Sequence, residues 1–205
     1  MHYEIRESED GVGQVLIPRG AWTPECALRL TVGDINALRL TESFGLCDTD
    51  LTFLAKFPRL RSIEVYSWRV KDLSAISHLA CIEVLGLQTK ARTKLRGSDF
   101  PALRVAKLQW AKGMEGLLSV STLEYLNVIN FPYADLALLH ELTRLRRLSL
   151  TSRKLASLDG IEQCSNLEHV DLYRCPELRS LDPLARCPKI ARIEVESCRH
   201  IPNRR

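Results

Sequence analysis

Aliphatic residues recur along this chain in one short pattern: an aliphatic residue, two variable positions, and two further aliphatic residues separated by one position. The clearest copy is the sequence LRRLSL, which begins at Leu145. Seven further copies begin at Ile35, Leu60, Ile82, Leu103, Leu123, Leu167 and Ile190, and a degenerate copy begins at Val12. From Leu60 onward, successive copies start 20 to 23 residues apart. We therefore expect nine turns of one repeated structure.

Each copy predicts a short β-strand, because side chains two positions apart in a strand share a face. Between the copies, apolar residues recur at every third position, as in Leu155, Leu158, Ile161 and Cys164. This spacing favours 3₁₀ or extended segments over long helices, since side chains at i and i+3 of a 3₁₀ helix align. The longest helix candidate is residues 133–143. One turn cannot bury both of its sides, so the turns must stack with their strands parallel.

The predicted fold is an α/β solenoid with a parallel sheet on its concave side and short helical or 3₁₀ segments on its convex side. We expect a single repeat domain over residues 1–205, with an N-terminal cap and the degenerate first turn in residues 1–34. The repeats occupy residues 35–198, and a polar C-terminal cap follows at residues 199–205. Tyr3 and Ile5 alternate with polar residues before the turn pair Asp10-Gly11, which predicts a capping hairpin within residues 1–17.

The repeated pattern resembles that of leucine-rich-repeat proteins, over roughly residues 12–198. It is most similar to the short-repeat type found in bacterial internalins and in the phosphatase-regulating sds22-like group. The resemblance implies a right-handed horseshoe in which an asparagine, or sometimes Cys or Thr, follows the last aliphatic residue by three positions. Those positions here hold Ser43, Trp68, Lys90, Ala111, Phe131, Arg153, Cys175 and Cys198. We expect the two aromatic residues among them to pack within their loops.

The charge of the chain is small and its ionisable residues are dispersed. The formal net charge is +4, and acidic and basic residues are interspersed, so we expect no nucleic acid partner. No apolar stretch approaches the roughly 20 residues of a membrane span, and the first residues lack the apolar region of a signal peptide. The seven cysteines include no C-x-x-C motif. We therefore expect a protein of the reducing cytoplasm, of bacterial type by its resemblance, with no membrane partner.

The candidate site consists of residues that alternate with the core aliphatics or directly follow the strands, so that they face outward on the concave sheet and equivalent positions of successive copies form columns across it. They are Tyr66, Gln88, Lys107, Gln109, Trp110, Tyr125, Asn127, Ile129, Arg147, His169, Asp171, Tyr173 and Arg174. The middle of this surface is neutral, and we expect Val84 and Val105 to be exposed there. The C-terminal third is charged and also contains Arg192, Glu194 and Glu196.

Tyr, Trp and Arg are enriched among the residues that dominate protein interfaces, so this surface predicts a partner protein. Two plainer interpretations remain open. Trp110 and Tyr125 can pack along the sheet as cross-strand neighbours. Arg147 can pair with Asp171, and Arg192 with Glu194, as a solvated network of small net value.

Catalytic and metal-binding motifs are incomplete in this sequence. The string HELTR at His140 has Arg144 where the second zinc ligand of H-E-x-x-H must stand. Cys164, Cys175, Cys187 and Cys198 recur 11 or 12 residues apart, which the repeat explains by itself and which favours buried apolar cysteines over a zinc site. A hydrolase built on Cys175, His169 and Asp171 would require these groups to converge.

The sequence therefore predicts a non-catalytic protein–protein interaction module without cofactor or metal. Two alternatives share its surface: an immunity-like inhibitor of a toxin or enzyme, and a phosphatase-type regulatory subunit.

Overall fold

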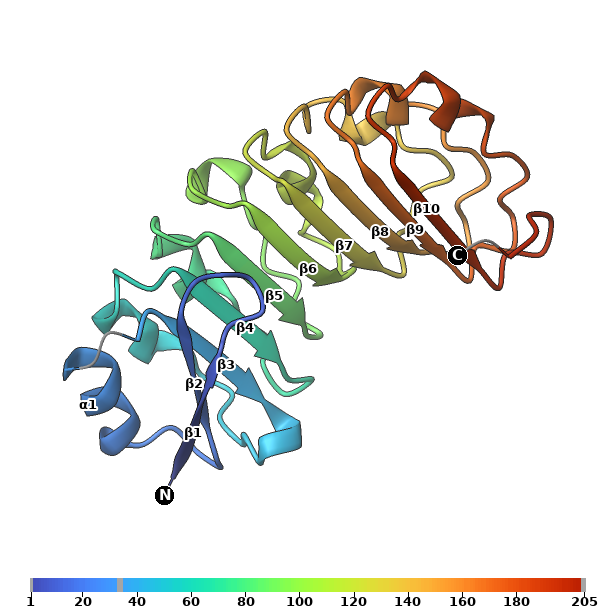
Figure 1. Ribbon diagram of the computed structural model, residues 1–205. Coiled ribbons are helices and arrows are strands. Elements are labelled where there is room, and N and C mark those ends of the chain that lie inside the picture. Colours follow the sequence, from blue (N-terminus) through green and yellow to red (C-terminus); the bar gives the residue numbers. More distant parts are fainter. Residues whose placement is uncertain (1, 33–34, 204–205) are drawn as a thin grey trace. The chain divides into compact units, whose positions relative to one another are not determined.

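The computed structural model describes residues 2–32 and 35–203 (Figure 1). These residues form two compact units. Unit 1 consists of Met1–Val105 and Ala111–Gly116, and unit 2 consists of Ala106–Trp110 and Leu117–Arg205. The parts of the predicted caps at residues 1, 33–34 and 204–205 lie outside the described residues.

Unit 1 begins with an antiparallel hairpin and continues as a parallel sheet. Its strands are β1 (Tyr3–Glu7), β2 (Gln14–Pro18), β3 (Ala37–Thr41), β4 (Ser62–Tyr66) and β5 (Val84–Gln88). Its helical segments are α1 (Pro24–Val32) and the 3₁₀ segments η1 (Glu42–Phe44), η2 (Thr52–Lys56), η3 (Ser74–His78) and η4 (Gly97–Asp99). β1 pairs with β2 antiparallel, as the predicted hairpin requires, and β2 to β5 pair parallel.

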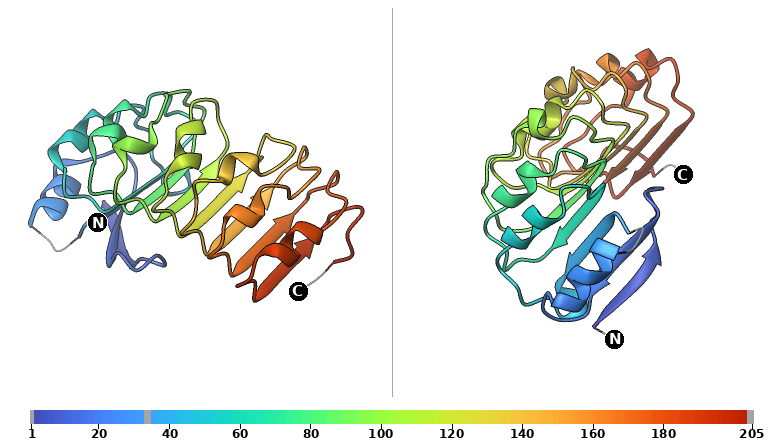
Figure 2. Two further views of the ribbon diagram at one scale, coloured as in Figure 1. Left: turned by 90° about the horizontal axis from the view of Figure 1, so that it is seen from above. Right: turned by 90° about the vertical axis from the view of Figure 1, so that its left-hand side faces the viewer.

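Unit 2 repeats the parallel arrangement. β6 (Val105–Gln109) starts at the boundary between the units and is followed by β7 (Tyr125–Ile129), β8 (Arg147–Thr151), β9 (His169–Tyr173) and β10 (Arg192–Glu196). β7 to β10 pair parallel in chain order. The 3₁₀ segments are η5 (Glu115–Ser119), whose first two residues belong to unit 1, η6 (Ala137–Leu139), η7 (Ile161–Gln163) and η8 (Asp182–Arg186). Figure 2 shows the 3₁₀ segments on one side of the strands.

The strands confirm the predicted repeat, since each of the nine strands from β2 to β10 begins within one of the nine sequence copies and ends one residue after it. Their aliphatic residues form the core between the sheet and the 3₁₀ segments: Leu145 and Leu148 are fully buried, and Leu150 is 1% exposed. Truncating one such leucine to alanine costs about 2–5 kcal/mol. The opposite face of the sheet, which points away from the 3₁₀ segments, is called the open face below.

The predicted helix at residues 133–143 is wrong. Only Ala137–Leu139 is helical there, and it is a 3₁₀ segment. Leu136, Leu139 and Leu142 are all fully buried, and their backbone N–H groups bond three residues back, Leu139 to Leu136 and Leu142 to Leu139, at 2.9 Å each. An α-helix would rotate Leu142 away from the side that the other two leucines face. The three-residue spacing therefore excludes the α-helix that local propensity favours.

Six of the strands end in one of two kinds of turn. After β4, β5 and β8, the residue two positions beyond the last aliphatic is a buried hydroxyl: Ser67, Thr89 or Ser152. The Ser152 hydroxyl donates to the carbonyl of Phe131 at 2.7 Å and accepts from the amides of Lys154 and Leu155. These hydroxyls satisfy loop amides, as the asparagine of the family pattern is expected to do, but one position earlier.

After β7, β9 and β10, the same position has a left-handed backbone, and the following residue is buried instead. The left-handed residues are Asn130, Arg174 and Ser197, with φ of 62°, 54° and 58°. The buried residues are Phe131, Cys175 and Cys198. Phe131 therefore packs in its loop as predicted. The same prediction for Trp68 is wrong, because Ser67 occupies the interior and leaves Trp68 38% exposed.

Candidate functional site

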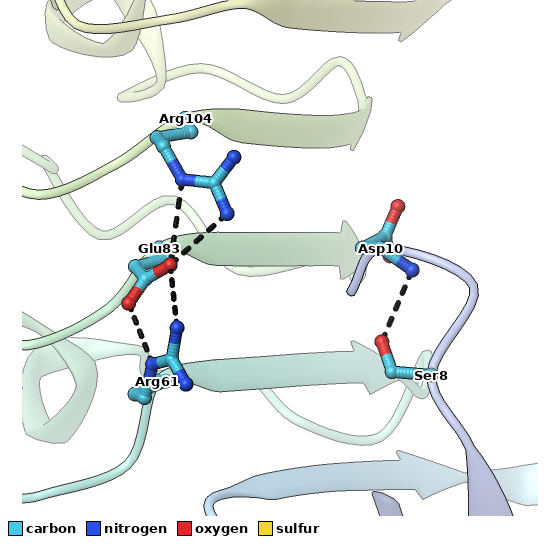
Figure 3. A network of polar contacts seen from close by, with 5 residues as sticks. All are labelled: Ser8, Asp10, Arg61, Glu83 and Arg104. Carbon is cyan, nitrogen blue, oxygen red and sulfur yellow. Dashed lines mark hydrogen bonds and ion pairs between the residues drawn. The ribbon is translucent and has the colours of Figure 1, made fainter. Parts of the chain in front are cut away.

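The open face of unit 1 is largely covered. Ser62 is 2% exposed and Val84 is fully buried, although both alternate with the core aliphatics. The connection between β1 and β2 runs across this face (Figure 1), and Val12 within this connection is only 4% exposed. Figure 3 shows Ser8 and Asp10 beside the carboxyl ends of β4 and β5. The expected exposure of Val84 and Val105 is therefore wrong: they are 0% and 7% exposed.

Beneath this hairpin, Glu64 forms a polar cluster with its neighbours. Glu64 is 2% exposed, its carboxylate accepts a hydrogen bond from Arg39 Nε, and the Tyr66 hydroxyl donates to it at 2.8 Å. Burial, reinforced by the charge of Glu64, raises the pKa of Tyr66. Gly86 lies under the cluster, where an added Cβ would approach the Tyr66 hydroxyl to 2.7 Å. The Tyr66 side chain is thus fixed by its contacts with Glu64 and Gly86. Gln88, on the next strand, is half-buried.

The open face of unit 2 shows the predicted columns of residues. The first contains Tyr125, Arg147, His169 and Arg192; the second contains Asn127, Ser149, Asp171 and Glu194; the third contains Ile129, Thr151, Tyr173 and Glu196. In the third column, Ile129 is 43% exposed and Tyr173 is 37% exposed. The structure thus brings together seven of the predicted site residues on β7, β8 and β9, and Arg174 follows β9 directly.

The first two columns are held together by contacts between charged and aromatic side chains. Arg147 Nη2 lies 2.9 Å from Asp171 Oδ2, and its guanidinium lies over the Tyr125 ring at 5.0 Å from the centre. The hydrogen bond to Asp171 raises the pKa of Arg147. Arg192 pairs with Glu194. These contacts confirm the predicted ion pairs, and the exposure of both arginines limits each pair to less than about 1 kcal/mol.

Trp110 packs at the strand ends and does not stack on Tyr125. Its ring meets the rings of Phe131 and Tyr133 edge-on, at centroid distances of 6.4 and 5.6 Å, and its backbone N–H donates to the carbonyl of Ile129. Trp110 is half-buried in this cluster. It is therefore anchored by aromatic neighbours in the loop after β7.

The remaining predicted residues of unit 2 are half-buried polar groups. Lys107 and Gln109 lie on β6, Asn127 on β7 and His169 on β9. Asn127 Nδ2 donates to the Tyr125 hydroxyl at 3.4 Å, which is a long contact. These residues add hydrogen-bonding groups to the strands of unit 2.

Beside Tyr173 the surface is hollowed. A pocket of about 170 Å³ lies between β9 and β10 and is lined by Asp171, Leu172, Tyr173, Arg192, Glu194, Val195 and Glu196. The Arg174 guanidinium lies over the Tyr173 ring at 5.1 Å, and its backbone N–H donates to the carbonyl of Glu196. The sequence predicts Tyr173 as a site residue but contains no signal for this pocket.

Cys175 is not placed to act as a nucleophile with His169 and Asp171. Cys175 is fully buried, and its thiol contacts the backbone carbonyls of Leu150 and Tyr173, while His169 and Asp171 lie on the open face. Burial raises the pKa of the Cys175 thiol to about 12, which disfavours the nucleophilic thiolate. Among the described residues, no group of three or more His, Cys, Asp or Glu side chains is placed to hold a metal ion. In the same residues, no helix has the length and apolar character needed to cross a membrane.

Comparison with known proteins identifies the repeat directly. The family model described as leucine-rich repeats, two copies, matches residues 143–186, which contain β8 and β9. Comparison with curated protein sequences gives no match.

Solved structures share the fold. Internalin C2 of Listeria monocytogenes is 23% identical, with a TM-score of 0.67, over 89% of this chain and 80% of its own. Internalin F of the same organism is 16% identical, with a TM-score of 0.54, over 80% of this chain and 47% of its own. A chain of the Drosophila Toll–Spatzle complex is 15% identical, with a TM-score of 0.53, over 88% of this chain and 30% of its own. With its nine motif copies, its parallel strands and its short 3₁₀ segments, the chain has a leucine-rich-repeat fold similar to that of the internalins.

Proposed function

We propose that this chain is a non-catalytic interaction module that binds a partner protein on the open face of unit 2, the concave side of the predicted solenoid. Leucine-rich-repeat proteins such as internalins mediate protein–protein interactions. One of the similar chains comes from a complex, that of Toll with Spatzle. The observation that carries the proposal is the exposure of Ile129 and Tyr173 in one column of this face.

The column offers a partner an apolar contact with an aromatic residue close by. Ile129 aligns with Thr151 and Thr151 with Tyr173, so the two exposed side chains stand two strands apart, roughly 10 Å. Arg174 stacks on Tyr173 and adds a cation beside the ring. Tyr and Arg are enriched among interface residues that lose more than about 2 kcal/mol of binding energy on truncation.

The surroundings of the column suit the polar rim of such an interface. Arg147 pairs with Asp171 and Arg192 with Glu194, so these four charges are already balanced within the chain. Paired, exposed charges contribute little affinity but favour correct orientation and exclude like-charged competitors. We therefore assign the affinity to Ile129, Tyr173 and Arg174, and the orientation of the partner to the paired charges.

The test compares two exposed aliphatic residues on different faces of unit 2. Ile129 on the open face is 43% exposed, and Leu138 in η6 is 44% exposed. The variants Ile129→Asp and Leu138→Asp are used as baits in lysate of the source cells, and captured proteins are quantified by mass spectrometry. We expect a stoichiometric partner of the unchanged chain to be retained by Leu138→Asp and lost with Ile129→Asp. Retention by Ile129→Asp, or loss with Leu138→Asp alone, would place the partner elsewhere.

A further inference from the structure

Seven exposed cationic side chains border unit 1 where its strands end. Arg69 and Lys71 follow β4, Lys90, Arg92, Lys94 and Arg96 follow β5, and Lys112 follows β6. All seven are exposed, and the ion pairs found among residues 2–32 and 35–203 join other side chains. The Lys90 ammonium lies 6.0 Å from the ring centre of the exposed Trp68. We call these seven residues together with Trp68 the basic edge.

Backbone contacts place these cations on adjacent turns. The amide of Leu73 donates to the Thr93 hydroxyl at 2.9 Å, which joins the turn after β4 to the turn after β5. The amide of Leu95 donates to the carbonyl of Gly113 at 2.8 Å, which joins the latter to the turn that holds Lys112. A Cβ at Gly113 would lie 2.5 Å from the carbonyl oxygen of Thr93, so these two turns are in close contact.

The segment 90–96 presents its charges at regular intervals. Ala91 and Leu95 point into the core and are 2% and 1% exposed, whereas Lys90, Arg92, Lys94 and Arg96 are exposed. Such alternation is that of an extended chain, in which residues on one side recur every 6.6 to 6.8 Å, approximately. An extended peptide lying alongside presents its own alternate side chains at the same interval, so alternating carboxylates would match these cations one for one.

The positive charge of the basic edge is local. Unit 1 contains 15 Lys and Arg residues and 14 Asp and Glu residues, and is nearly neutral as a whole. Carboxylates also border the edge: Glu42 accepts from the Ser67 hydroxyl and the Arg69 amide, and Asp72 accepts from Ser74 and Thr93. The hydrogen bonds hold the pKa values of both carboxyls below their usual range, so both stay ionised.

This distribution favours a short anionic partner segment over a long polyanion. A nucleic acid extends well beyond seven residues of protein, and would meet the carboxylates of Glu42 and Asp72. It also gains most from proteins with a surplus of positive charge over a whole domain, which unit 1 lacks. An acidic peptide segment can end where the cations end, and its apolar residues can contact Trp68.

We propose that the basic edge is a second interaction surface, which binds an extended acidic segment of a partner protein with its alternate carboxylates facing Lys90, Arg92, Lys94 and Arg96. This surface belongs to unit 1 and acts independently of the open face of unit 2. The sequence does not reveal this surface, because the four cations of residues 90–96 alternate with neutral residues. Only the fold brings Arg69, Lys71 and Lys112 of the neighbouring turns beside them.

The test measures binding of a fluorescent peptide of alternating Glu and Ser, long enough to span residues 90–96, by anisotropy. One variant neutralises the edge with Lys90→Gln, Arg92→Gln, Lys94→Gln and Arg96→Gln. The control variant removes the same charge from exposed positions of unit 2 with Arg144→Gln, Arg153→Gln, Lys154→Gln and Arg179→Gln. A single-stranded oligothymidylate serves as the competing polyanion, and its affinity is compared with that of the peptide. Thermal melting verifies that both variants fold.

We expect the edge variant to bind the peptide about tenfold or more weakly, since each exposed ion pair contributes modestly and four are lost. The control variant should bind as the unchanged chain does, and added salt should weaken binding in both. Equal losses in the two variants, or no peptide binding by the unchanged chain, would overturn the proposal. Tighter binding of the oligothymidylate that depends on the same four residues would also overturn it, in favour of a nucleic acid site.

Discussion

The guanidinium of Arg147 lies over the ring of Tyr125, 5.0 Å from its centre, and at the same time bonds Asp171 on the opposite neighbouring strand. One side chain thus joins β7, β8 and β9 on the open face. Because a cation is attracted to the face of an aromatic ring, this arrangement holds Tyr125 against the sheet. A partner that binds the third column as proposed would therefore meet a surface that is already ordered.

The Arg147–Asp171 pair should contribute little to stability. The Arg147 side chain is 51% exposed, so solvent screens the interaction. In a double-mutant cycle with Arg147→Ala and Asp171→Ala, we expect a coupling free energy below about 1 kcal/mol, measured by urea unfolding. A coupling above about 2 kcal/mol would show that the pair is shielded from solvent.

Gly86→Ala should destabilise unit 1. The added Cβ would lie 2.7 Å from the Tyr66 hydroxyl and 2.8 Å from Cγ of the buried Glu64. Forcing an extra carbon into such a site costs about 1–3 kcal/mol of unfolding free energy. Tyr66→Phe removes one of the two close atoms, so the double variant should lose less than the sum of the two single variants. Strict additivity in urea unfolding would exclude this contact as the cause.

Ser152→Ala should destabilise unit 2 far more than Ser149→Ala, although the two serines belong to the same repeat. The fully buried Ser152 hydroxyl makes three hydrogen bonds to the backbone. Removing it leaves buried backbone groups unsatisfied, at a cost of about 1–3 kcal/mol. Ser149 is half-buried on the open face and should tolerate alanine within about 0.5 kcal/mol. Similar losses in both variants would show that the hydroxyl does not replace the asparagine of the family pattern.

The buried cysteines should resist alkylation. Burial raises the pKa of the Cys164 and Cys175 thiols to about 12, whereas Cys47 and Cys81 are exposed. With iodoacetamide at pH 8, mass spectrometry should find Cys47 and Cys81 modified first and Cys164 and Cys175 modified only when urea is added. Rapid native labelling at Cys175 would contradict the buried position of its thiol.

The same thiols should make the protein sensitive to alkali. In the unfolded chain they ionise near their ordinary value of 9.0, and in the folded chain only near 12. Between these values the unfolded state has lost protons that the folded state retains, so stability is fully present below about pH 9 and falls as pH rises toward 12. The free energy of unfolding of Cys164→Ala/Cys175→Ala should fall less steeply over this range than that of the unchanged chain.

The strands and their alignment follow from the sequence because they depend on a local pattern that recurs. The motif spacing alone predicts that Tyr125, Arg147 and His169 share one column, and the strand pairing confirms this. The ion pair of Arg147 with Asp171 follows from the same columns. Repetition gives these predictions their strength, since every turn contacts neighbours of the same design.

The failures concern features that no repeat specifies. Val84 is buried, and the connection of residues 8–13 runs across its face of the sheet, a non-local arrangement whose only sequence signal is Val12, an apolar residue between two glycines. Trp68 is exposed because Ser67 occupies the interior. Whether a strand is followed by a buried hydroxyl or by a left-handed residue depends on backbone conformation, which composition does not reveal. Trp110, Tyr66 and the other candidate site residues have the positions described above, and their part in binding remains a prediction.

The left-handed backbone at Arg174 bears on how this surface should drift during evolution. At φ of 54°, glycine or asparagine would occupy the position with less steric conflict than an arginine, whose β-carbon crowds the backbone. Neutral drift should therefore replace arginine here readily, as it would at Ser197, wherever only the turn matters. If the proposed binding at Tyr173 and Arg174 holds, we expect arginine to persist at this turn in lineages that keep the partner and to give way to glycine or asparagine in those that lose it.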